Sequence, residues 1–168
     1  MNNETEIRRA TADDIGAIRS VAEVAFRAAY AAILSPEQTD YMMEMMYSAE
    51  SLHRQMEVER QAFYLAVDNG RTIGYVSVEQ QGERLFHLQK IYLLPECQGR
   101  GIGERLFRCA CRHIKSLCPE PCTMELNVNR HNRARGFYER MGMRKVREGD
   151  FPIGRGYYMN DYIMAVEL

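Results

Sequence analysis

The sequence predicts one mixed α/β domain, residues 1–168, in which strands and amphipathic helices pack around a single core. Two observations predict this class. The 168 residues suit one domain of ordinary size, and a hydrophobic content of 46% is typical of globular proteins. In addition, the hydrophobic period switches between strand-like and helix-like along the chain. One core implies one principal site.

The charge and the N-terminus exclude several function classes. The start of the chain contains acidic residues and no apolar run, so neither a secretion signal nor a later membrane-spanning segment is predicted. A net charge of -1 argues against a protein that follows a nucleic-acid backbone. We therefore expect a cytoplasmic protein without nucleic-acid or membrane partners, and leave a homodimer open.

The five cysteines are odd in number and form no C-x-x-C pair, so reduced thiols are predicted. A metal site built from Cys118, Cys122 and His113 is the alternative. No metal is expected.

The first sixty residues read as a strand followed by helices. Glu6–Ala10 form the strand, and Asp13 or Asp14 is expected to cap the next helix. Ser35 before Pro36 marks a second helix start, and a short helical stretch follows over Ala49–Arg60. The apolar residues with helical spacing in the first helix are Ile18, Val21, Ala22, Ala25, Phe26 and Ala29.

A hairpin and a third strand follow. Phe63–Val67 and Thr72–Val78 alternate as strands around Asn69-Gly70, a pair that supplies the positive φ angles of a tight turn. The third strand covers Leu85–Leu93 and stops before Pro95.

The second half alternates helix and strand. An apolar stripe opposite arginines predicts a helix from Ile102 to the Cys118-Pro119 break. Because this helix is a crossover connection, the strand Met124–Val128 should run parallel to Leu85–Leu93. The chain then closes with a helix at Arg133–Met141 that ends at Gly142, and with strands at Lys145–Arg147 and Tyr157–Glu167.

A glycine loop separates the third strand from the long helix. Gly99, Gly101 and Gly103 lie where backbone N–H groups can approach an anion at a helix N-terminus. The loop lacks G-K-[ST] and does not follow G-x-G-x-x-G, so neither a Walker A loop nor a dinucleotide fingerprint is indicated. The loop predicts a phosphate-bearing ligand, or else a turn that only lets helix and strand pack.

Two motifs together resemble the GCN5-related N-acetyltransferase (GNAT) superfamily. Gln98 completes the motif Q-x-x-G-x-G, and residues 132–142 match N-x-A-x-x-F-Y-E-x-x-G. The resemblance covers essentially the whole chain and departs at Met143, where the family usually has Phe. It implies a mixed central sheet of about six to seven strands, about four flanking helices, and splayed parallel central strands.

The resemblance implies acetyl-CoA as co-substrate. Its pyrophosphate would lie on the amides of Gly99–Glu104, and its pantetheine arm beside the strand that ends at Leu93, whose N–H would polarise the thioester. Asn132 would help to anchor this arm. The implied set is Ile91, Tyr92, Leu93, Gln98, Gly99, Arg100, Gly101, Ile102, Gly103, Glu104, Asn132 and Tyr138.

The same resemblance assigns the catalytic acid to Tyr138, because a phenol is a suitable proton donor for a leaving thiolate. Phe137 beside it is expected in the core. Where the family often has a basic Glu, this chain has His87 and Gln89. His87 is therefore the candidate base, with two carboxylates as weaker alternatives, Glu79 and Glu125.

The acceptor is expected to be a small primary amine. The runs Phe137–Gly142 and Met159–Met164 look similar to bacterial polyamine (spermidine/spermine) acetyltransferases. Acetylation of a protein N-terminus or lysine is an alternative, and so is an acyl-CoA-binding sensor with little activity. Expected neighbours of the acceptor are Phe26, Tyr30, Tyr75 and the segment 157–162.

Overall fold

The computed structural model describes residues 4–168, so the first three residues of the N-terminus predicted to lack a secretion signal lie outside it. One seven-stranded sheet has the order β1-β2-β3-β4-β5-β7-β6. Only the β4–β5 pair is parallel. The strands are β1 (Glu6–Arg9), β2 (Ala62–Asp68), β3 (Arg71–Gly82), β4 (Leu85–Leu93), β5 (Thr123–Asn129), β6 (Arg144–Gly154) and β7 (Tyr157–Glu167).

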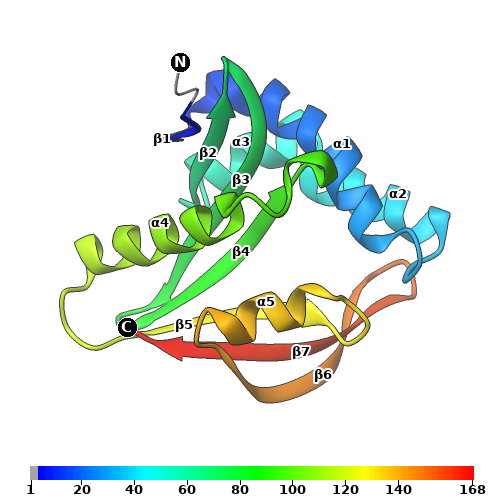
Figure 1. Ribbon diagram of the computed structural model, residues 1–168. Helices are drawn as coiled ribbons and strands as arrows, with labels where there is room; N and C mark the ends of the chain where they lie inside the picture. Colours follow the sequence, from blue (N-terminus) through cyan, green and yellow to red (C-terminus); the bar gives the residue numbers. More distant parts are fainter. Residues whose placement is uncertain (1–3) are drawn as a thin grey trace.

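Helices cover both faces of this sheet. Figure 1 shows α1, α2 and α3 behind the sheet and α4 and α5 in front of it. The bounds are α1 (Ile15–Tyr30), α2 (Pro36–Tyr47), α3 (Ala49–Glu57), α4 (Ile102–Leu117) and α5 (Ala134–Arg140). The α/β fold with a parallel central pair is confirmed, with five α-helices where about four were expected.

The core forms on both faces from the stripes that the sequence shows. Ile18 and Phe26 of α1 and Leu106 and Ile114 of α4 are almost fully buried. Their periodic spacing places them on one side of each helix, which faces the sheet. The sheet is therefore fixed between two helical layers, and its central strands hold their positions.

The N-terminal caps differ partly from the prediction. Ser35 accepts a hydrogen bond from the N–H of Gln38, as expected of an N-cap. Asp14 occupies the N-cap position of α1, but its carboxylate does not cap this helix. It instead pairs with Arg8 at 2.8 Å and accepts the N–H of Thr11. Asp14 therefore joins α1 to β1.

Strand β6 is longer than the Lys145–Arg147 segment that we predicted. It pairs with β7 from Arg144 to Gly154, at the edge of the sheet. Most of its residues are exposed, so the strand lacks the apolar alternation that reveals a buried strand.

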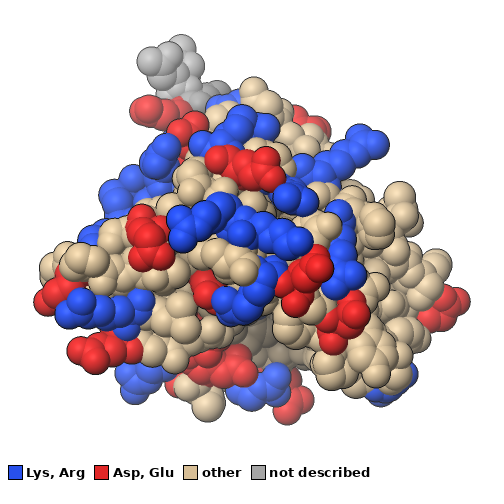
Figure 2. Space-filling model, turned by 90° about the horizontal axis from the view of Figure 1, so that it is seen from below, with Lys and Arg blue, Asp and Glu red and all other residues tan. Residues whose placement is uncertain are grey.

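Within residues 4–168, no helix is long and apolar enough to cross a membrane. No three metal-ligating side chains lie together in this part of the chain, and the alternative metal ligand His113 contacts Tyr64 at 3.0 Å. Seen from below, the surface mixes basic and acidic side chains rather than gathering one sign (Figure 2).

Candidate active site

The two central strands separate along their length. β4 and β5 pair only at their beginnings, through three register pairs that end at His87 and Glu125. Beyond that point β4 remains paired with β3 up to Leu93, and β5 with β7 up to Asn129. The strands diverge visibly in Figure 1. This wedge leaves backbone groups on the facing edges of β4 and β5 without a strand partner.

The glycine loop opens onto α4 with its amides free. Gly99 and Gly101 adopt φ angles of 81° and 77°, a conformation that favours glycine. No side chain caps α4 at Gly101. Across the described residues, none of the N–H groups from Gly99 to Glu104 has a hydrogen-bond acceptor. Six free donors at a helix N-terminus suit a pyrophosphate, so the residues present fit the CoA expected here.

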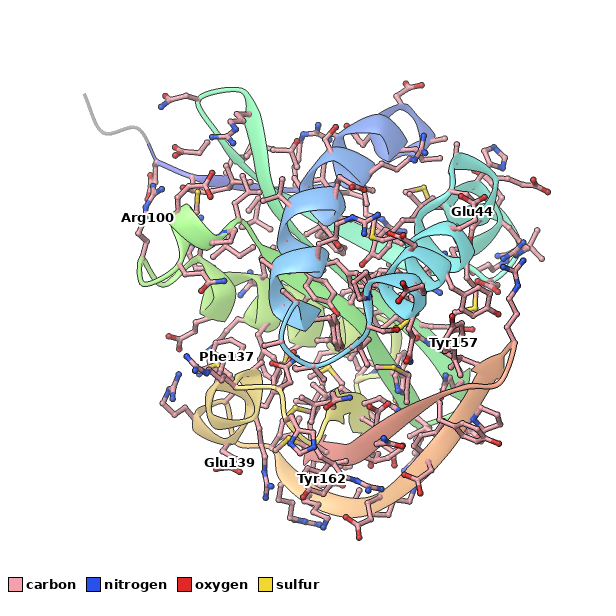
Figure 3. The ribbon with its side chains drawn as sticks, turned by 90° about the vertical axis from the view of Figure 1, so that its right-hand side faces the viewer. Glu44, Arg100, Phe137, Glu139, Tyr157 and Tyr162 are labelled. Atoms are coloured by element: carbon pink, nitrogen blue, oxygen red, sulfur yellow. The ribbon has the colours of Figure 1, made fainter. Side chains whose placement is uncertain are left out.

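The loop carries a basic residue and packs closely against α5. Arg100 extends from the loop at the edge of the molecule (Figure 3) and lies 3.4 Å from Asp68. A Cβ on Gly103 would lie 3.6 Å from the ring of Phe137, so α4 and α5 approach closely there. Phe137, which we expected in the core, is only partly buried and packs against the core from outside, whereas its neighbour Tyr138 is buried within it.

Tyr138 lies on α5 with 8% of its surface exposed. Burial holds the pKa of this phenol well above its usual value, and the neighbouring Tyr30 raises the pKa further. Its hydroxyl therefore carries a proton at neutral pH, as a proton donor must. The effect of Tyr30 also places Tyr138 near α1, on the far side of the sheet from its own helix.

A polar row crosses the wedge near its closed end. Nε2 of His87 lies 2.9 Å from Oδ1 of Asn127, and Nδ2 of Asn127 donates to Oδ2 of Asp161 at 3.2 Å. Both ends of the row are buried and lack a partner within residues 4–168: Nδ1 of His87 and Oδ1 of Asp161. Because Asp161 orients the Asn127 amide, Nε2 of His87 carries the proton and Nδ1 is free to accept one.

The weaker base candidates are already engaged. Glu79 accepts a hydrogen bond from Gln89 at 2.7 Å. Glu125 forms a two-pronged ion pair with Arg147, which holds the pKa of this carboxyl below its usual value. Both carboxylates therefore have structural partners, which leaves His87 as the better placed base.

Asn132 has a local role in the structure. Its side-chain oxygen accepts the N–H of Ala134 and so begins α5. Burial raises the pKa of Tyr30 on α1, and a hydrogen bond with the Asn132 side chain acts against this rise, so Asn132 lies beside the tyrosines of α1. A role of Asn132 in anchoring the pantetheine arm stays a prediction.

Tyrosines line the α1 side of the wedge. The ring of Phe26 on α1 lies 5.6 Å from that of Tyr92 on β4, and Tyr75 donates to Tyr47 at 2.7 Å. Of the expected acceptor neighbours, Phe26, Tyr30 and Tyr75 are buried in this cluster. Tyr157 packs against Tyr41, 5.5 Å between ring centroids, away from it.

Sequence reasoning did not single out Asn127 or Asp161. Asp161 lay within the segment named as an acceptor neighbour, and its signal was an acidic residue next to the buried, apolar end of β7. No sequence pattern shows that Asn127 lies beside it, because the two residues are more than thirty positions apart in the chain.

Comparisons with known proteins test the resemblance that the sequence motifs indicated. The profile of the acetyltransferase (GNAT) domain family matches residues 30–152. A comparison with curated protein sequences finds no match.

Solved structures with the same fold include three acetyltransferases. The N-acetyltransferase PaiA from Thermoplasma acidophilum, in complex with coenzyme A, is 24% identical with a TM-score of 0.82, over 98% of this chain and 99% of that one. An acetyltransferase from Thermus thermophilus is 16% identical with a TM-score of 0.73, over 100% of both chains. The ribosomal-protein-S18-alanine N-acetyltransferase from Escherichia coli is 16% identical with a TM-score of 0.72, over 98% and 94%.

Proposed function

The chain belongs to the acetyltransferase (GNAT) domain family, and on this basis we propose that it transfers the acetyl group of acetyl-CoA to a primary amine of a small molecule. A polyamine is the first candidate, because two runs of the sequence look similar to polyamine acetyltransferases. We propose that residues 1–168 act as one transferase domain. The observation that carries the proposal is the wedge with six free amides at one end and a buried phenol beside it.

Backbone groups would make most of the contacts that hold the co-substrate. The amides of Gly99–Glu104 would bind its pyrophosphate, helped by Gln98 and Arg100. The free edge of β4 at Ile91–Leu93 would pair with its pantetheine arm as it would with a strand. A protein with the same fold was solved with coenzyme A, which supports this arrangement.

The chemistry needs one proton donor and one proton acceptor. Acetyl-CoA supplies an acetyl thioester when bound. The Leu93 N–H would polarise its carbonyl. Tyr138 would give its proton to the sulfur as the carbon–sulfur bond breaks. Nδ1 of His87 would take, through water, the proton that the amine nitrogen loses as it bonds to the acetyl carbon. The buried position of Tyr138 and the tautomer of His87 support these roles.

Binding and turnover test the proposal in one preparation. Acetyl-CoA is titrated by calorimetry, and CoA thiol release is followed with spermidine, putrescine, a peptide with a free N-terminus and a lysine peptide. We expect acetyl-CoA to bind and one of the small amines to give the fastest release. Tyr138→Phe should lower kcat by about 100-fold or more while acetyl-CoA still binds.

Tyr64→Phe is the matched control, because this tyrosine lies on β2 and contacts His113 of α4, outside the wedge. It should leave kcat unchanged. Failure of acetyl-CoA to bind would overturn the assignment of the glycine loop. Release with the peptides alone would replace the small amine by a protein acceptor, and binding without release would favour a sensor.

A further inference from the structure

Asp161 carries a carboxylate oxygen that the fold leaves unused. The residue has 5% of its surface exposed. Oδ2 accepts the Asn127 amide, whereas Oδ1 is buried with no donor among residues 4–168. A buried anionic oxygen without a donor costs stability, and such groups occur where a ligand supplies the missing donor.

The carboxylate faces the α1 side of the sheet, at the open end of the wedge. Asp161 pairs with Asn129, the last residue of β5, so the two side chains lie on the same face. Burial raises the pKa of Tyr30 on α1, and the charge of Asp161 raises this pKa further, which places the two side chains near each other. Asp161 therefore lies beside the tyrosine-lined end of the candidate site, across the wedge from β4.

The protein supplies no cation on this face. No lysine or arginine in the described part of the chain forms an ion pair with Asp161. Burial raises the pKa of Asp161, and the Asn127 hydrogen bond and the charge of Arg130 act against this rise. The Arg130 guanidinium itself binds Asp150 and lies over the ring of Tyr162. Tyr162 follows Asp161 along β7 and so points to the opposite face. Arg135 of α5, which also binds Glu139, lies 4.6 Å from the Tyr162 ring, so the Tyr162 side chain lies on the α5 side.

We propose that Asp161 is a specificity-determining residue that binds an ammonium group of the acceptor, with Asn127 holding the carboxylate in position. This inference rests on the proposed function and narrows its acceptor to cationic amines. An ammonium supplies what Oδ1 lacks, a charged donor, and burial strengthens their attraction. Because the carboxylate is covered, the acceptor must displace neighbouring side chains to reach it.

The test compares cationic and neutral acceptors in Asp161→Asn. Spermidine and putrescine are charged at about pH 7.5, whereas the nitrogen of aniline is not. We expect the KM of both polyamines to rise by about 10- to 100-fold, with kcat changed by less than about threefold. The KM of aniline and the affinity for acetyl-CoA should stay unchanged.

Two further variants keep the test decisive. Asp150→Asn removes an exposed carboxylate from the neighbouring strand and should change no KM. Asp161→Asn should melt no lower than the wild type, because asparagine still accepts the Asn127 bond and removes a buried charge. Asp161→Ser should repeat the effect on polyamine KM in a smaller side chain.

Each remaining outcome overturns the inference. An unchanged polyamine KM in a folded variant would contradict it, as would an equal loss with aniline or a fall in kcat alone. Failure of the proposed function is seen separately, in the wild type: if no amine releases CoA, both proposals fall before any variant is compared.

Discussion

Lys90 places a cation in the interior of the α3 side of the sheet. It has 7% of its surface exposed, and its Nζ donates to the side-chain oxygens of Gln55 and Gln61. The ammonium also lies over the ring of Phe63, at 5.4 Å. Burial lowers the pKa of Lys90 to about 8. Within residues 4–168, no carboxylate bonds to this ammonium, and only the more distant charges of Glu59 and Glu79 favour its protonated form.

This lowered pKa predicts a stability that rises with pH. In the unfolded chain a lysine has a pKa of about 10.4. Between pH 8 and 10.4 the unfolded state therefore binds more protons, and the free energy of unfolding increases with pH across this window. From about pH 7 to 9.5 the gain attributable to Lys90 is about 2 kcal/mol. Urea unfolding of the wild type and of Lys90→Met at several pH values measures this gain, as the change with pH in the difference between their free energies of unfolding. A difference that stays constant across the window would contradict the prediction.

Some of the functional and buried residues could be identified from the sequence alone, and others could not. Tyr138, the glycine loop and Asn132 belong to contiguous motifs, so their neighbourhood was predictable. His87 was found because it stands where a carboxylate was expected. Asp161 and the burial of Lys90 were not, because both depend on which strands and helices meet across the sheet.

Among the elements, the N-terminus of α4 contains a glycine, Gly101, that both adopts a positive φ angle and lies among the free amides of the loop. Gly101 and Gly70 share a φ of 77°, and a Cβ at either position would meet nothing within 4 Å. Gly70 forms the turn between β2 and β3, whereas Gly101 lies among the free amides of the loop. The two glycines are thus matched in conformation and differ in what surrounds them.

Alanine at each position separates backbone cost from ligand binding. Gly101→Ala and Gly70→Ala should each lower the free energy of unfolding by about 1 kcal/mol, because L-residues disfavour this conformation. Only Gly101→Ala should weaken acetyl-CoA binding, by about 10-fold, since it disturbs donors aimed at the pyrophosphate. Calorimetry with both variants checks this, and equal binding would remove the loop from the site.

Elements with a buried stripe or a glycine turn were predictable, and β6 was not. The hairpin at Asn69-Gly70, the stripe of α4 and the bounds of β4 follow directly from local chemistry. β6 is an edge strand whose exposed charges and Pro152 hide its pairing. The point where the pairing of β4 with β5 ends could not be predicted from the sequence either, since strand pairing depends on two segments that are distant in the chain.

The whole molecule consists of two sets of strands joined by a short seam. β1 to β4 form one antiparallel set and β5 to β7 another, and three register pairs connect them. Away from this seam, Tyr41 of α2 donates to the carbonyl of Ile153 at 2.6 Å. This bond attaches the tip of the β6–β7 hairpin to α2 and so also holds the two sets of strands together. A ligand in the wedge would contact both.

Acetyl-CoA should therefore stabilise the whole molecule. At about 100 times its Kd, a ligand that binds only the folded state adds about 2.7 kcal/mol. For a chain of this size, the Tm should rise by about 5–10 °C. Hydrogen exchange should slow on both sides of the wedge, in residues 88–93 and 126–129. Protection limited to α4 would contradict a ligand that bridges the two sets.

The seam of three register pairs also makes the resistance of the protein to proteolysis depend on its ligand. Local opening begins where few pairs hold, and proteases cleave the opened form. Acetyl-CoA bound in the wedge, as we propose, would lower the population of this form, so we expect proteolysis to slow as acetyl-CoA accumulates.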